Sequence, residues 1–75
     1  MATEQEKAER FKRVAENRTN KIIDMVRLLG NLSVKATYDY SEKDISKIFS
    51  SIERELRIAK LKFTDAEDTN KKFKL

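Results

Sequence analysis

The chain has 75 residues and a net charge of +4, from 17 Lys and Arg against 13 Asp and Glu, and it contains no Cys, His, Pro or Trp. Without Cys no disulfide framework can form, and without Cys and His a structural zinc site lacks both of its usual ligand types. Catalysis by imidazole or thiol is excluded for the same reason. One Gly and no Pro leave few turn-forming residues for β-hairpins, so the composition predicts a single all-α domain.

The first predicted helix runs from about residue 4 to residue 29. Thr3 and Glu6 have the spacing of a capping box, in which each side chain accepts a hydrogen bond from the backbone of the other residue. Apolar residues then recur at helical spacing, at Phe11, Ala15, Ile22, Met25 and Leu29. Because the only glycine, Gly30, follows the last of them, we expect it to end the helix in the left-handed conformation.

The second predicted helix runs from about residue 42 to residue 63, after a connector without helical periodicity. Ser41 is a favourable N-cap, Asp44 occupies the third helical position, and Tyr40 and Ile45 have the spacing of a hydrophobic staple. Spacings of three and four place six apolar residues on one face, at Ile45, Phe49, Ile52, Leu56, Ala59 and Phe63. Residues 64–75 are expected to form a short C-terminal tail.

These elements predict a two-helix antiparallel hairpin over residues 1–63. Two helices give a thin core and leave apolar residues outside it, so we expect a homodimer with a four-helix arrangement to complete the core. The remaining apolar residues are candidates for binding a protein partner: Ile58, Leu61, Leu32, Val34 and Tyr38.

A basic flank of the first helix supports a second hypothesis, the binding of DNA or RNA. Its candidate residues are Arg10, Arg13, Asn17, Arg18, Asn20 and Lys21, with side chains that contact phosphates and base edges. An ordinary solvated helix face explains the same pattern, and a flank divided by Glu16 and Asp24 would favour a protein partner instead. Arg18 falls between Ala15 and Ile22 on the apolar face, where pairing with Glu53 or Glu55 of the second helix is the structural explanation.

The remaining ionisable residues do not suggest an enzyme. The chain has no Gly-rich phosphate loop, and Glu53 and Glu55, two residues apart on a helix, point in different directions, so we expect no catalytic residue, cofactor, metal or small-molecule substrate. No stretch approaches the roughly 18 apolar residues of a membrane-spanning helix, and the N-terminal residues are too polar for a signal peptide. A cytoplasmic location is therefore expected.

Two segments resemble one group of bacterial proteins: the run from Arg13 to Ile23 that continues through Arg27 to Ser33, and the run from Tyr38 to Phe63. The resemblance is to small helical proteins, without a firmly assigned activity, that integrative and conjugative elements, plasmids and prophages of Gram-positive bacteria encode. It covers roughly residues 10–63 and carries over no functional residue. It implies an accessory protein of a mobile genetic element that acts on DNA, on a conjugation or replication complex, or on a host-defence component. The sequence thus predicts a non-enzymatic interaction module that binds or inhibits a macromolecular partner, with nucleic-acid binding as the alternative.

Overall fold

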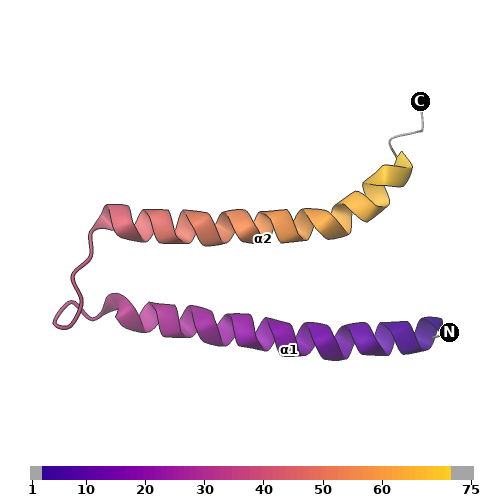
Figure 1. Cartoon of the computed structure of the whole chain (residues 1–75), viewed down its shortest axis with the longest axis horizontal. Helices are drawn as coiled ribbons and strands as arrows, with labels where there is room; N and C mark the ends of the chain where they lie inside the picture. Colours follow the sequence, from indigo (N-terminus) through magenta and orange to yellow (C-terminus); the bar gives the residue numbers. More distant parts are fainter. Residues whose placement is uncertain (1–2, 72–75) are drawn as a thin grey trace. The chain divides into compact units, whose positions relative to one another are not determined.

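The computed structural model describes the backbone of residues 3–71 and the side chains of residues 3–64. Within these residues the chain is all-α and has no strand, as the composition predicts. It contains α1 (Glu4–Gly30), the short 3₁₀ helix η1 (Asn31–Ser33) and α2 (Glu42–Lys71) (Figure 1). The chain divides into two units, Met1–Asp39 and Tyr40–Leu75, and each is described by itself.

Both helices begin at a reciprocal cap, as predicted. At α1 the Glu6 backbone N–H donates to the Thr3 hydroxyl at 3.1 Å, and the Thr3 N–H donates to the Glu6 carboxylate at 3.3 Å. At α2 the Asp44 N–H donates to the Ser41 hydroxyl at 3.1 Å, and the Ser41 N–H donates to the Asp44 carboxylate at 3.0 Å. A cap of this kind stabilises a helix by about 1 kcal/mol, because it satisfies backbone donors that have no partner within the helix.

The end of α1 differs from the prediction. Gly30 is not left-handed: it has φ −60° and ψ −28° and forms the last residue of the α-helix. The chain then tightens into η1, and the Asn31 N–H reaches the carbonyl oxygens of Arg27, Leu28 and Leu29. Because a 3₁₀ turn satisfies these carbonyl groups, the helix ends without the positive φ that favours glycine.

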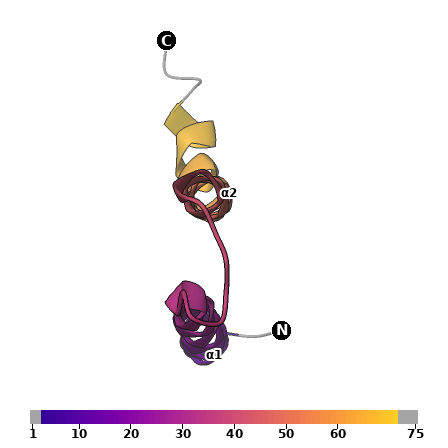
Figure 2. The ribbon, with the colours of Figure 1, turned by 90° about the vertical axis from the view of Figure 1, so that its left-hand side faces the viewer.

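The connector contains one further turn and no strand between Val34 and Ser41 (Figure 2). The Val34 carbonyl oxygen accepts hydrogen bonds from the N–H groups of Thr37 and Tyr38, at 3.1 and 3.0 Å. These hydrogen bonds fix the backbone of residues 34–38 in a turn, although apolar residues do not recur at helical spacing in this segment.

The second helix is longer than predicted: α2 ends at Lys71 rather than at Phe63. The Thr64 hydroxyl donates to the Lys60 carbonyl oxygen at 3.3 Å, so Thr64 lies within a continuing helix and does not cap a new one. Residues 64–71 contain no Gly or Pro to stop the helix, which explains why the expected tail does not begin at residue 64. Residues 72–75 of that tail lie outside the described residues.

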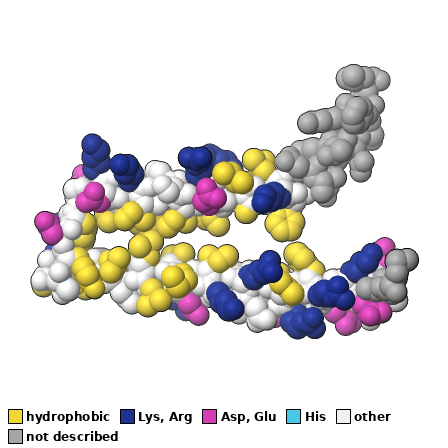
Figure 3. All heavy atoms as spheres, in the orientation of Figure 1, with side chains coloured by type: hydrophobic (Ala, Val, Ile, Leu, Met, Phe, Trp, Pro, Cys, Tyr) yellow, Lys and Arg dark blue, Asp and Glu magenta, His cyan; other side chains and the backbone are white. Residues whose placement is uncertain are grey.

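The apolar side chains of the described residues are arranged on helix faces and not in a buried core. None of the described side chains is buried, and Val14, Ala15, Leu29, Tyr40 and Ile52 are half-buried. On α2, hydrophobic side chains line one edge of the helix, while the opposite edge carries basic side chains together with acidic ones and, farther along, some hydrophobic ones (Figure 3). This segregation is the pattern of helices that are stabilised by covering an apolar face.

The right-handed backbone of Gly30 predicts the effect of replacing this residue by alanine. A Cβ atom at Gly30 would meet no heavy atom within 4 Å, and the backbone there is right-handed. We therefore expect Gly30→Ala to stabilise the helix by about 0.5–1 kcal/mol, because alanine loses less backbone entropy on folding. Thermal unfolding followed by circular dichroism measures the change. Gly30→Asn is the control: a left-handed Gly30 would make Asn the better tolerated substitution, and that order would contradict the observed backbone.

Candidate interaction surfaces

The apolar face of α2 consists of Ile45, Phe49, Ile52, Leu56, Ala59 and Phe63. Successive members are three or four residues apart, so they lie within a narrow strip along the helix. Phe49, Leu56 and Phe63 are 43%, 54% and 67% exposed. This face is the most regular apolar surface of the described residues.

The apolar face of α1 consists of Phe11, Ala15, Ile22, Met25 and Leu29, and a cation interrupts it. At about 100° per residue, Arg18 lies between Met25 and Leu29 in angle, within the apolar strip. The Arg18 side chain is exposed. The predicted position of Arg18 on this face therefore agrees with α1, whereas its pairing with Glu53 or Glu55 stays a prediction because α1 and α2 belong to different units.

The residues predicted to bind a protein partner are all exposed, but they lie in both units. Leu32 belongs to η1, and Val34 and Tyr38 belong to the turn that follows it. Ile58 and Leu61 lie on α2, about 140° or more from the centre of its apolar face. The structure thus groups Leu32, Val34 and Tyr38 within one short segment, and it places Ile58 and Leu61 one turn apart on a separate surface.

The basic flank predicted on α1 is exposed, and an acidic residue lies at its C-terminal end. Arg10, Asn17 and Lys21 lie within about 40° of one another around the helix axis, and Arg13 and Asn20 lie on the far side of Asp24 in angle. Arg18 lies on the apolar face instead of the flank. Asp24 follows Lys21 by three residues, so it lies at the C-terminal end of the flank and not between Arg10 and Arg13. The flank therefore stays a candidate surface for nucleic acid.

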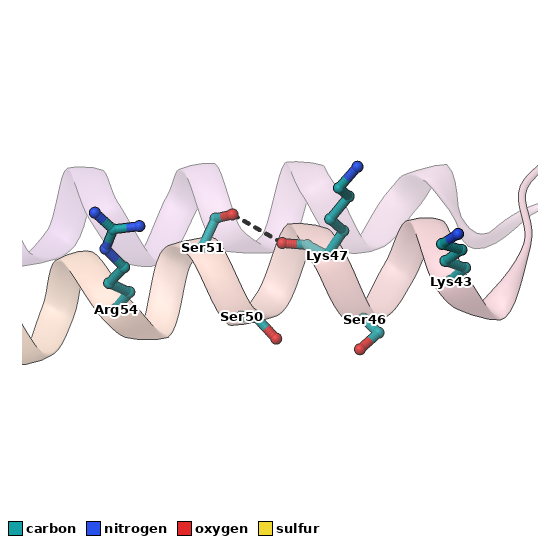
Figure 4. Close-up of a pocket in the computed structure, with 6 residues that line it drawn as sticks. All are labelled: Lys43, Ser46, Lys47, Ser50, Ser51 and Arg54. Carbon is teal, nitrogen blue, oxygen red and sulfur yellow. Dashed lines mark hydrogen bonds between the residues drawn. The ribbon is translucent and has the colours of Figure 1, made fainter.

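A second basic surface lies on α2, opposite its apolar face. It is an open groove of about 450 Å³ lined by six residues, which we call the basic stripe: Lys43, Ser46, Lys47, Ser50, Ser51 and Arg54. Figure 4 shows Lys47 and Arg54 rising from one edge of this surface and Ser46 and Ser50 along the other. The Ser51 hydroxyl donates to the Lys47 carbonyl oxygen at 2.9 Å. The hollow forms because short serine side chains lie between long cationic ones.

The order of charged residues along the second helix does not reveal this stripe. Glu42, Asp44, Glu53 and Glu55 alternate with the bases in sequence, which suggests a mixed surface. Around the helix axis, however, each of these acids lies about 80° or more from Arg54, on the sides of the helix. Projecting the polar residues on the helix, and not only the apolar ones, would have revealed the stripe.

The described residues offer no candidate for a metal site or a membrane-spanning segment. These residues contain no group of three or more His, Cys, Asp or Glu positioned to hold a metal ion. In the same part of the chain, neither helix combines the length and the apolar composition that a membrane crossing requires.

Comparison with known proteins identifies no relative of this chain. No protein-family model matches the sequence. No curated protein and no solved structure matches the chain.

Arg18 generates a prediction for stability. A charged side chain in the middle of a face that becomes covered is destabilising unless it is fully paired, so Arg18→Leu is expected to stabilise the folded protein by about 1–4 kcal/mol. Thermal unfolding at a fixed protein concentration measures this. Arg13→Leu, which makes the same change on the polar side of α1, is the control and is expected to stay within about 0.5 kcal/mol of the parent protein. Lower stability of Arg18→Leu would show that Arg18 makes a required polar contact.

Proposed function

We propose that the protein is a non-enzymatic interaction module whose two apolar faces pack as an antiparallel hairpin and whose core is completed by a second copy in a four-helix arrangement. The observation that carries the proposal is that no large hydrophobic side chain on the two helix faces is buried and most are exposed: Phe49 and Leu56, for example, are 43% and 54% exposed. Covering each such side chain contributes about 1.5–3 kcal/mol, which is the stabilisation that two long helices without a buried core require.

In this proposal, the apolar residues outside the two faces bind a macromolecular partner. Ile58, Leu61, Leu32, Val34 and Tyr38 are 40% to 52% exposed and include one aromatic side chain, a residue type enriched in protein interfaces. The resemblance described above suggests that the module is an accessory protein of a mobile genetic element, working in the cytoplasm, which binds or inhibits its partner. The basic flank of α1 is the alternative route to the same role, through nucleic acid.

Self-association tests the structural half of the proposal. Light scattering over a concentration series is expected to give about twice the chain mass of 8.8 kDa. Leu56→Glu places a charge on the apolar face of α2, and the lost burial of about 2 kcal/mol or more is expected to weaken the dimer by about thirty-fold.

Ser50→Glu is the matched control, because it adds the same charge on the opposite side of the same helix. Its association is expected to equal that of the parent protein. A monomeric parent protein at high concentration, or equal effects of the two variants, would refute the dimer.

Affinity capture tests the functional half. The immobilised full chain is expected to retain a partner from a lysate of the source organism, and Ile58→Glu with Leu61→Glu is expected to reduce the retained amount at least tenfold, because both substitutions place charges in an apolar contact. Asn17→Glu with Asn20→Glu adds the same charge to the polar flank of α1 and is expected to leave capture unchanged. Capture that is lost only in this second variant would favour the α1 flank and contradict the proposed contact.

A further inference from the structure

We propose that the basic stripe of α2 binds the phosphate backbone of a nucleic-acid duplex, without reading its sequence. The stripe lies opposite the apolar face of α2, so this site is separate from the proposed dimer contact and does not depend on it. It also differs from the flank of α1, which belongs to the other unit of the chain.

The charge of the stripe is uniform. Lys43, Lys47 and Arg54 are its ionisable residues, and no acidic residue lines the groove. The nearest acids in sequence lie on the sides of the helix, as described above. A surface of three cations without a competing carboxylate attracts a polyanion and is not already neutralised by its own helix.

The serines make this surface suited to phosphate groups. Their short side chains allow an anion to approach the helix between the long cationic side chains, and hydroxyl groups are common donors to phosphate oxygens. Ser51 donates to the Lys47 carbonyl oxygen, whereas the hydroxyl groups of Ser46 and Ser50 make no hydrogen bond to another described residue. Ser46 and Ser50 therefore can donate to a ligand.

The dimensions of the stripe fit several phosphates. From Lys43 to Arg54 the helix rises about 16 Å, at 1.5 Å per residue. Phosphates of one duplex strand are spaced about 3.4 Å apart along the axis, so this length corresponds to about five of them. Three cations distributed over that length can contact three separate phosphates.

The residue types favour a duplex over the other polyanionic partners. Single-stranded nucleic acid is held by aromatic side chains that stack on bases, and the stripe has none. Protein interfaces depend on apolar or aromatic anchors in their centre, and these are also missing from the six lining residues. Binding to a duplex backbone requires neither, because cations and hydroxyl donors supply the contacts.

The test uses the full chain and fluorescence anisotropy with a mixed-sequence duplex of DNA and one of RNA. Neutralising three phosphates predicts a slope of about −2.7 for the logarithm of the association constant against that of the salt concentration, hence about 40-fold weaker binding at 200 mM than at 50 mM salt. The triple variant Lys43→Gln, Lys47→Gln and Arg54→Gln is expected to bind at least tenfold more weakly at 50 mM salt, with a slope near zero.

A matched control distinguishes the effect of the basic stripe on binding from the effect of the net charge alone. Arg10→Gln, Arg13→Gln and Lys21→Gln removes the same three charges from α1 and is expected to keep both the affinity, within about threefold, and the slope. Circular dichroism confirms that both variants remain helical. The proposal would be overturned if both triple variants lost the same affinity for the duplex, or if the parent protein bound no duplex at 50 mM salt. It would also be overturned if the protein bound single strands alone, or if polyglutamate competed for the protein as well as the duplex does. The Leu56→Glu variant is expected to retain the stripe's affinity per chain, so failure of the dimer proposal and failure of this one are distinguishable.

Discussion

Burial of the apolar faces is the constraint on which the stability of both helices depends. The N-terminal caps at Thr3 and Ser41 fix where α1 and α2 begin, but each contributes only about 1 kcal/mol. Helical propensity adds little in water without tertiary contacts, even over helices of 27 and 30 residues. Since none of the described side chains is buried, the missing stabilisation has to come from packing one apolar face against another. If that packing involves a second copy, folding and association become one equilibrium, and stability depends on protein concentration.

The two helices differ in how continuous an apolar face each one offers for packing. The apolar face of α2 is unbroken from Ile45 to Phe63, and the opposite side carries the basic stripe, so one helix presents two chemically distinct surfaces. On α1, Arg18 interrupts the apolar face, and the basic flank ends next to Asp24. A cation in an otherwise apolar face is costly for stability, but such residues can fix the register or the number of helices that associate. Arg18 therefore points to selection of one packing arrangement, and α2 carries the more continuous apolar face.

The sequence predicts the starts of the helices well and their ends poorly. Thr3 with Glu6, and Ser41 with Asp44, form the expected reciprocal hydrogen bonds because capping is a local interaction between residues three apart. Helix ends depend on competition between several ways of satisfying the last carbonyl groups. Gly30 is therefore helical before a 3₁₀ turn, and α2 continues past Phe63. The basic stripe follows from sequence only after projection around the axis, while the partner of each apolar face does not follow at all, because hydrophobic burial is not directional.

The position of Ile58 and Leu61 links the two proposed binding activities. Ile58 lies four residues after Arg54 and Leu61 seven residues after it, so both continue the same side of α2 on which the basic stripe lies. The distance from Arg54 to Ile58 is about 6 Å along the axis, far less than the width of a nucleic-acid duplex or of a folded protein. A duplex bound along Lys43 to Arg54 would therefore obstruct a protein bound at Ile58 and Leu61. The two proposed ligands are therefore expected to compete for the side of α2 opposite its apolar face.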